Sequence, residues 1–471
     1  MAGQRPRQAT QAREQLGEPL LEVGVRVRAF DGLYVWRPGF IPATCAARLA
    51  GVWRADASIR PASNRAVDMR GLYRLPLLAI ALLCPVGIAP AQLLPGGAVP
   101  SLPGVGEVTG PVAGAARGVV ASPLLREPFD LARRLQVREL LRREARRVEL
   151  DPRGEPVLRG EFLAMGLEAT ARDAVLAAGF KVVRAADEGE ALGIRIVVLR
   201  DTRRRDAGRA MQALRAAAPG AEFAYQHLYL PAGPAVPARA ASPSAPPPML
   251  RVGLVDGGVA ASAVRGMRVE RLGCDAREIA EPHGTAVAAR LAAGARGTLY
   301  AADLWCGDRV GRATLGLVEA LGWMARERVP VVNVSLVGPD NPVLARAVRA
   351  MVERGHVIVA AVGNDGPAAP PLYPAAYAGV VGVSAVDAKL RVLPEAGSGP
   401  QVDFSAPGVV GARMRGTSFA APVVARAAAL LMREPSPQLA RDVQRALAAR
   451  AKDLGAPGRD ARYGEGLIAA D

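Results

Sequence analysis

The sequence is poor in the residues that most often transfer protons, coordinate metals or stack on nucleobases. Its 471 residues include three histidines and four cysteines, and aromatic residues make up 4% of the chain. Few side chains can therefore act as a general base. Cys274 and Cys306 lack metal-ligand spacing, and no dense carboxylate loop is present, so we expect neither a metal site nor a cofactor.

The positive charge of the chain does not indicate a nucleic-acid partner. The net charge is +16. From Leu250 onward there are 26 Lys and Arg against 21 Asp and Glu, whereas the part before Leu250 has 34 against 23. The excess is scattered arginine without interleaved aromatic residues, which is typical of a solvated surface. We expect no nucleic-acid partner.

The apolar run Leu75–Ile88 is too short and too rich in proline to span a membrane. It follows the basic stretch Met69–Arg74 and precedes Ala89-Pro90-Ala91, a pattern typical of a secretory signal peptide over residues 69–91. Residues 1–68 show no helical period and are interpreted as an unstructured extension that results from a mis-assigned start, with translation beginning at Met69. A buried internal helix is the alternative for the apolar run. With a signal peptide, the product would be secreted or periplasmic and would keep no stable membrane span.

The remaining chain divides by composition. Residues 92–126 are rich in Gly, Pro and Val and are expected to form a flexible linker. Residues 127–230 predict a helix followed by a βαββαβ unit, a small α+β ferredoxin-like domain. Residues 231–249 form a Pro/Ala/Ser linker suited to self-cleavage. From Leu250 to Asp471, apolar strands alternate with helices, which predicts an α/β fold with a doubly wound parallel sheet.

A hydroxyl group stands at the start of a buried helix. Gly416-Thr417-Ser418 precedes a run of small and apolar residues, and Pro422 is assigned to the first helical turn. Backbone N–H groups at such a terminus favour negative charge, so Ser418 could attack a carbonyl there.

A serine nucleophile requires a base and a group that orients the base. His283 stands before Gly284 and another small-residue helix, whereas His227 and His356 read as strand residues. Asp256 ends the apolar run Val252–Val255, so it should lie at the carboxyl edge of a sheet. The chain order Asp, His, Ser is the order found in subtilisin.

With these residues the second half of the chain resembles the subtilisin-like serine proteases, the subtilases. Further segments match the family in its order: Asn333–Pro339, Ala360–Gly366, Phe404–Gly408, Asp453–Asp460 and Tyr463–Gly466. The resemblance implies a subtilisin-like catalytic domain that hydrolyses peptide bonds through an acyl-enzyme.

The resemblance also implies a role for each matching residue. Asp256 would orient His283, His283 would act as base and then acid, and Ser418 would be acylated. Asn364 would donate to the oxyanion, although by itself it reads as a turn residue. The segment Ser335, Leu336, Val337 and Gly338 would pair with an extended polypeptide substrate, although Ser335 alone reads as a plain strand serine.

Two positions depart from the family pattern. Gly257 stands where Ser or Thr usually follows the aspartate, so a local hydroxyl hydrogen bond is missing. Val337 stands where a second glycine is common, which would narrow the cleft or change the first specificity pocket.

The resemblance extends to the βαββαβ unit, which is similar to the inhibitory propeptides of subtilases. The chain would then be a zymogen whose own propeptide is an intramolecular inhibitor.

In an oxidising compartment Cys274 and Cys306 would form a disulfide, and two buried thiols are the alternative. For the whole protein the alternatives are a catalytically weak relative that binds peptides and an esterase with the same chemistry.

Overall fold

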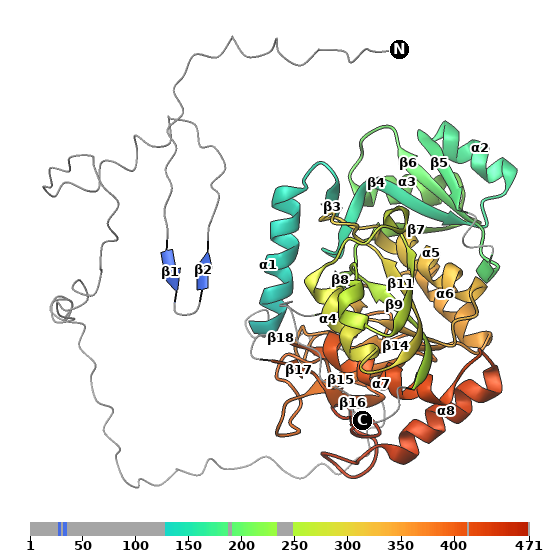
Figure 1. The fold of residues 1–471 in the computed structure, drawn as a ribbon. Helices are drawn as coiled ribbons and strands as arrows, with labels where there is room; N and C mark the ends of the chain where they lie inside the picture. The colour runs from blue at the N-terminus through green and yellow to red at the C-terminus, as the bar shows by residue number, and fades with distance from the viewer. Residues whose placement is uncertain are drawn as a thin grey trace, which may run out of the picture. The chain divides into compact units, whose positions relative to one another are not determined.

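We describe a computed structural model of the chain that covers residues 27–29, 32–34, 128–186, 191–232, 248–411 and 414–469 (Figure 1). The chain forms two units, Met1–Ala113 and Gly114–Asp471. In the first, β1 (Val27–Ala29) pairs antiparallel with β2 (Gly32–Tyr34). This differs from the unstructured extension expected for 1–68, because three-residue strands are too short to show a period. The signal peptide 69–91 and the linker 92–126 lie outside the described residues.

The second unit contains a seven-stranded sheet in which every neighbouring pair is parallel. Its strands, from one edge to the other, are β10 (Met267–Leu272), β11 (Arg296–Asp303), β9 (Met249–Asp256), β12 (Val331–Val334), β14 (Val357–Ala361), β15 (Val381–Val386) and β16 (Phe404–Pro407). The central strands are runs of Val, Ile and Ala, and every residue of β12, β14 and β15 is buried. Such runs occur where helices cover both faces of a parallel sheet.

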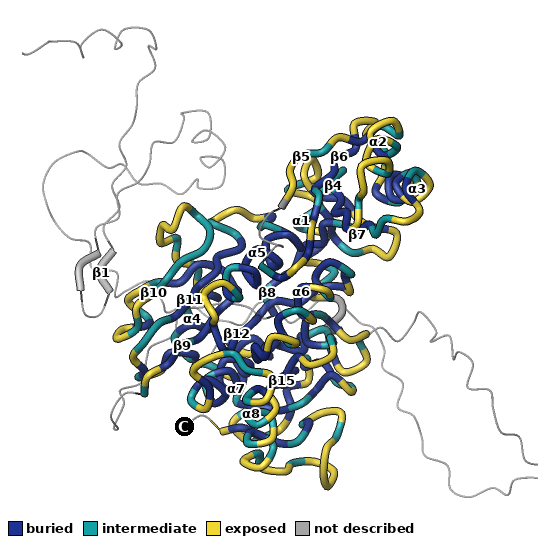
Figure 2. The backbone as a smooth tube through the Cα atoms, turned by 90° about the vertical axis from the view of Figure 1, so that its right-hand side faces the viewer, coloured by how far each residue is buried: buried dark blue, intermediate teal, exposed yellow. Residues whose placement is uncertain are grey.

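Helices cover both faces, which confirms the predicted α/β architecture. On one face α4 (Pro282–Leu291), α7 (Thr417–Leu431) and α8 (Pro437–Arg450) share a core. On the other, α5 (Ala313–Arg326) and α6 (Pro342–Glu353) form a second core. Figure 2 shows the central strands between these helices as buried.

Helix α7 is the most deeply enclosed of the described helices. Twelve of its fifteen residues are buried, and it packs against β9, β12, β14, β15 and β16. Pro422 lies inside the helix, not in its first turn as predicted. Because proline has no N–H, the carbonyl of Ser418 one turn earlier is left free. The hydroxyl of Ser335 donates to that carbonyl at 3.1 Å, which satisfies the buried acceptor.

The predicted antiparallel α+β domain is present between α1 (Pro128–Arg143) and the parallel sheet. Its elements are β3 (Val148–Leu150), β4 (Pro156–Met165), α2 (Ala169–Ala177), β5 (Phe180–Ala186), β6 (Ile196–Asp201), α3 (Ala207–Ala217) and β7 (Glu222–His227). Strand β4 pairs antiparallel with β7 and with β6, β6 pairs with β5, and β3 pairs with the start of β4. Helices α2 and α3 cover one face of this sheet.

The other face of the antiparallel sheet packs on α5 and α6 (Figure 1). Leu163, Ile196 and Ala224 belong to the same buried cluster as Leu317 and Val348. The antiparallel sheet therefore buries its second apolar face against the parallel-sheet domain and not against helices of its own.

A buried polar network lies at this interface. His227 Nε2 is 3.2 Å from Asp151 Oδ2, and His227 Nδ1 is 3.0 Å from Asn341 Nδ2. Thr314 donates to the backbone carbonyl of His227 at 3.3 Å. Both ring nitrogens are thus satisfied away from water, so His227 is a structural residue at the end of β7.

The predicted linker 231–249 begins later than expected. Strand β8 (Leu230–Pro231) pairs antiparallel with β13 (Leu336–Val337), and Ala232 is 3% exposed. The segment 231–249 is rich in Pro and Ala, which is typical of a linker. Its first two residues, Pro231 and Ala232, are nevertheless held by backbone pairing with the parallel-sheet domain. Residues 233–247 lie outside the described part of the chain.

Among the described helices, none is sufficiently long and apolar to span a lipid bilayer.

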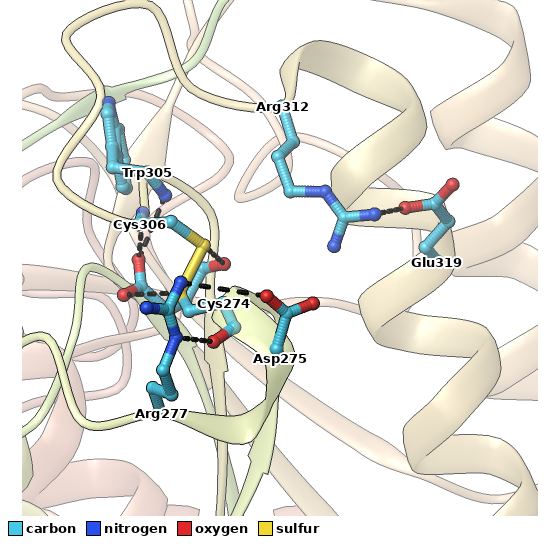
Figure 3. The surroundings of a disulfide bond; sticks show 8 residues. Cys274, Asp275, Arg277, Trp305, Cys306, Arg312 and Glu319 are labelled. Atoms are coloured by element: carbon cyan, nitrogen blue, oxygen red, sulfur yellow. Dashed lines mark hydrogen bonds and ion pairs between the residues drawn. A yellow bond between two sulfur atoms is a disulfide. The ribbon is translucent and has the colours of Figure 1, made fainter. Parts of the chain in front are cut away.

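A disulfide joins Cys274 to Cys306 (Figure 3). Cys274 lies in the short 3-10 helix η4 (Cys274–Ala276) after β10, and Cys306 lies in the loop after β11. The carboxylate of Asp303 shapes that loop, since Oδ1 accepts hydrogen bonds from the backbone N–H groups of Trp305 and Cys306, both at 2.9 Å. The crosslink closes a loop of 32 residues that contains the whole of α4 and β11.

Replacing both half-cystines, C274S with C306S, should lower the free energy of unfolding by about 2 to 4 kcal/mol, because the unfolded chain regains the entropy of that loop. Denaturant unfolding in an S418A background, which prevents self-digestion, measures the change. A reductant should destabilise the parent protein and leave the double variant unaffected. Equal sensitivity of the two proteins to reductant would contradict the prediction.

Candidate active site

Asp256 is the last residue of β9 and is fully buried. Its Oδ1 accepts a hydrogen bond from the backbone N–H of Gly257 at 2.6 Å and lies 2.8 Å from His283 Nδ1. Its Oδ2 is buried and has no hydrogen-bond partner among the described residues. The residue after Asp256 is a glycine, which has no hydroxyl group to donate. The Asp256 carboxylate is therefore held through Oδ1 alone.

His283 is the second residue of α4 and follows Pro282 at the helix start. A carboxylate only accepts hydrogen bonds, so the contact with Asp256 places the ring hydrogen on Nδ1 and leaves Nε2 as an acceptor. The helix must approach the aspartate loop closely for this contact. Gly284 permits the approach, because a Cβ there would lie 2.2 Å from the carbonyl oxygen of Gly257.

Ser418 is the second residue of α7 and is fully buried. The next residue, Phe419, packs its ring 5.4 Å from the ring of His283, so the first turn of α7 lies against the imidazole. The Ser418 hydroxyl donates to the backbone carbonyl of Ser335 at 3.1 Å, while His283 Nε2 has no hydrogen-bond partner in the described part of the chain. The Ser418 hydroxyl is therefore hydrogen-bonded to the backbone and not to the imidazole.

Asn364 follows β14 and has its side chain fixed by two contacts. Its Oδ1 accepts the backbone N–H of Thr417 at 3.0 Å, which orients the amide group so that Nδ2 faces the carbonyl oxygen of Ala232. The hydroxyl of Thr417 in turn accepts the N–H of Gly363 at 3.1 Å. The backbone N–H of Ser418 lies 3.4 Å from the same Ala232 oxygen. Two donors thus converge on one carbonyl.

Gly416 makes room for this convergence. Its φ is +143°, and a Cβ there would lie 2.7 Å from Asn364 Nδ2 and 2.9 Å from the Ala232 oxygen. Any other residue would displace either the amide donor or the carbonyl that it contacts.

The segment predicted to pair with substrate lies beside these groups. In it, Leu336 is paired with Pro231 and Val337 with Leu230, while Ala232 donates its N–H to the carbonyl of Ser335 at 3.2 Å. Gly338 continues the segment and contacts the ring of Tyr229. An extended polypeptide therefore lies along Ser335–Gly338 with antiparallel backbone pairing.

The described residues contain one cluster with the composition of a metal site, formed by Cys274, Asp303 and Cys306. Because the two sulfur atoms are joined to each other, only the carboxylate remains as a ligand. The cluster does not fit a metal ion.

The other two histidines lie away from Ser418. His227 belongs to the interface network described above, and His356 precedes β14 at the amino end of the sheet. His356 is buried, its Nδ1 is 2.6 Å from the carbonyl oxygen of Val329, and burial lowers its pKa. Neither contacts the residues around Ser418 by any hydrogen bond described for the chain.

Comparison with known proteins identifies the family of the chain. The model of the subtilase family matches residues 275–466. Subtilisin DY from Bacillus licheniformis is 32% identical over 246 residues, which cover 46% of this chain and 88% of that protein. The chain belongs to the subtilase family of serine endopeptidases. The minor extracellular protease Epr of Bacillus subtilis is 36% identical to this subtilase over 162 residues, 32% of the chain, but the match spans only 25% of Epr.

A solved structure shares the fold. Fervidolysin from Fervidobacterium pennivorans, described as a keratinolytic enzyme related to subtilisin, aligns with a TM-score of 0.52 and 19% identity. The alignment covers 69% of this subtilase and 61% of fervidolysin.

The fold of this subtilase brings together the predicted site residues, which are far apart in the sequence. Three further residues contact this group and were not predicted from the sequence. Thr417 orients Asn364, and Ala232 contacts both amide donors. The third, Glu281, precedes α4, and its carboxylate fills the space that a side chain at Gly257 would occupy, with Oε2 at 2.4 Å from the position of such a Cβ. The glycine at position 257 was the one signal in the sequence that a different side chain occupies this space.

Glu281 adds negative charge beside the histidine. Burial, then repulsion from Asp303 and from Asp256, raises the pKa of the Glu281 carboxyl above its ordinary value of 4.5. Folded protein therefore retains this proton to a higher pH than unfolded chain does. As pH rises from about 4.5, ionisation of Glu281 favours the unfolded state and stability is lost.

The variant E281Q should remove this loss. We expect the free energy of unfolding of E281Q, minus that of its parent, to become more positive as pH rises from 4.5 to neutral. Urea unfolding at several pH values in the S418A background measures it. E278Q, which removes an exposed carboxylate from the same loop, is the matched control. A stability difference for E281Q that is constant with pH would show the prediction to be wrong.

Proposed function

We propose that this subtilase hydrolyses peptide bonds with Asp256, His283 and Ser418 through an acyl-enzyme. One observation carries the proposal: the Asn364 side-chain amide and the Ser418 N–H both contact a single backbone carbonyl, that of Ala232, next to the Ser418 hydroxyl. That arrangement is the one required to stabilise negative charge on a carbonyl oxygen under attack.

Each residue has a defined part in this reaction. His283 Nε2 takes the proton of the Ser418 hydroxyl as the oxygen bonds to the carbonyl carbon, and it later gives that proton to the leaving amine. Asp256 holds the Nδ1 hydrogen and stabilises the imidazolium that forms. Glu281 interacts electrostatically with the same ring and with Asp256. A water molecule, activated by His283, then hydrolyses the acyl-enzyme.

The proposal includes synthesis as a zymogen. The antiparallel domain packs on α5 and α6, and its C-terminal strand β8 pairs with the predicted substrate segment. A polypeptide in that position blocks other substrates, so the domain acts as an inhibitory propeptide until the connection after β8 is cut. Export is part of the same proposal, supported by the signal-like stretch at 69–91 and by the extracellular location stated in the name of Epr.

A peptide-binding role without catalysis is the second candidate. It is favoured by one observation, namely that the Ser418 hydroxyl donates to Ser335 and not to His283. Chemistry at Ser418 separates the two candidates.

A serine-directed fluorophosphonate should label Ser418 in the processed protein, and S418A should neither be labelled nor cut itself between the antiparallel domain and β9. Peptide mapping of the labelled protein and intact mass of both proteins provide the measurement. S398A, which removes a half-buried hydroxyl that donates to the carbonyl of Ala461 elsewhere in the domain, is the control and should behave like the parent. Absence of label at Ser418 in folded, processed protein would favour the binding role.

Removing the amide donor should slow catalysis more than it weakens binding. N364L is expected to lower kcat by about 10²- to 10³-fold, a magnitude measured for an oxyanion donor in subtilisin. The Michaelis constant should change little, because the contact strengthens in the transition state. Steady-state kinetics on a peptide substrate test this. A loss confined to KM would contradict the role of Asn364.

A further inference from the structure

The backbone stretch Tyr229–Ala232 lies beside Ser335–Gly338 as an extended chain. Strand β8 supplies Leu230 and Pro231, which pair with Val337 and Leu336, and the N–H of Ala232 donates to Ser335 at 3.2 Å. The pairing is continuous up to Ala232, so the register of this polypeptide relative to Ser418 is fixed.

In that register, Ala232 presents its carbonyl group to the reacting residues. Its oxygen accepts from the side chain of Asn364 and lies 3.4 Å from the N–H of Ser418. Among the described residues, no other carbonyl oxygen receives both donors. The carbonyl carbon of Ala232 is therefore the atom that the Ser418 oxygen would attack.

We infer that this subtilase cuts its own chain at the peptide bond after Ala232, and that its cleft takes polypeptides with a small residue at the cut and an aromatic residue three positions earlier. The inference rests on the proposed peptidase function and specifies its substrate. In the sequence the residue after Ala232 is Gly233, so the released part begins with Gly233.

The reaction balances within the chain and one water molecule. The Ser418 oxygen forms an ester with the Ala232 carbonyl carbon, the bond from that carbon to the nitrogen of residue 233 breaks, and His283 moves the serine proton to that nitrogen. Water then cleaves the ester, which leaves a carboxylate on Ala232 and restores the Ser418 hydroxyl. No oxidant or other reactant is needed.

The preference for a small residue follows from the enclosure of the Ala232 side chain. Ala232 is 3% exposed and belongs to the same buried cluster as Val337, which is also 3% exposed. Val337 pairs with Leu230, two residues before Ala232, and its branched side chain is buried in that cluster. A larger residue in place of Ala232 would have to displace packed side chains.

The preference for an aromatic residue follows from Tyr229. Its ring lies against Gly338, where an added Cβ would be 2.5 Å from the ring atom Cδ1, and its hydroxyl donates to the carbonyl of Pro339 at 3.0 Å. The side chain is 4% exposed. Gly338 thus leaves space for an aromatic ring to pack against the backbone, and the carbonyl of Pro339 accepts a hydrogen bond from the tyrosine hydroxyl.

The first test follows self-cleavage of the full chain. Intact mass and N-terminal sequencing of the processed protein should give a catalytic fragment that begins at Gly233. A232F should slow the cut at this bond by at least about tenfold, as expected when a pocket rejects added bulk. A235F, the same substitution at an alanine three residues later, is the matched control and should be cut like the parent. A fragment that begins elsewhere, or equal rates for A232F and the parent, would overturn the inference.

A second test does not depend on the folding of the A232F precursor. The processed enzyme is given the anilides of the peptides Tyr-Leu-Pro-Ala, Tyr-Leu-Pro-Phe and Ala-Leu-Pro-Ala. The first should have kcat/KM at least about tenfold above each of the others. V337G should reduce the discrimination against Tyr-Leu-Pro-Phe by a similar factor. Equal kcat/KM values for the three peptides, or an unchanged ratio in V337G, would contradict the specificity.

The two tests separate failure of the inference from failure of the proposed function. Labelling of Ser418 by the fluorophosphonate together with cleavage at another bond overturns only the inference. Absence of both labelling and cleavage overturns the peptidase function on which it rests.

Discussion

The position of helix α7 is the constraint on which the rest of the structure depends. Its start lies where the first turn contacts the ring of His283, the backbone of Ser335 and the side chain of Asn364. Its small apolar residues allow it to be enclosed between the sheet and α4. Because the helix is packed along most of its length, the N–H of Ser418 is fixed relative to the five strands of the parallel sheet that α7 contacts. Charge stabilisation at a carbonyl requires donors that are already oriented before reaction, and this packing provides them.

The same sheet places its reactive groups at one edge and its structural histidine at the other. Asp256 ends β9, and Ser335 and Asn364 follow β12 and β14, so all three lie at the carboxyl ends of parallel strands, whereas His356 precedes β14. The helices α5 and α6 on the second face are used differently, since they carry the antiparallel sheet. One face of the parallel sheet thus carries the helix that begins with Ser418, and the other carries the domain whose last strand pairs with β13.

Much of this arrangement could be predicted from sequence, and the exceptions have physical reasons. Continuous apolar runs such as Val357–Ala361 identify buried strands, and Asp256, His283, Ser418 and Asn364 stand in segments that match a known family. Strand β10 was not predicted, because Met267–Leu272 lies at an edge, mixes charged with apolar residues and has no buried member. The role of Ala232 was also missed, since its surroundings in sequence are those of a linker and only tertiary pairing reveals it. Glu281 could not be recognised from local pattern, because it replaces a side chain that is missing at Gly257.

The docking of the antiparallel sheet on α5 and α6 has a consequence for how long the cleft remains occupied. While one polypeptide connects β8 to β9, the strand in the cleft is present at an effective concentration in the millimolar range, whatever the amount of protein in solution. Once that connection is broken, the contact becomes an ordinary association of two molecules, and its occupancy falls as the sample is diluted. The ion pairs Arg184–Glu319 and Arg346–Glu222 span this contact, so salt weakens part of the attraction between the separated pieces. Dilution and ionic strength would then control what fraction of the cut protein is open to other polypeptides.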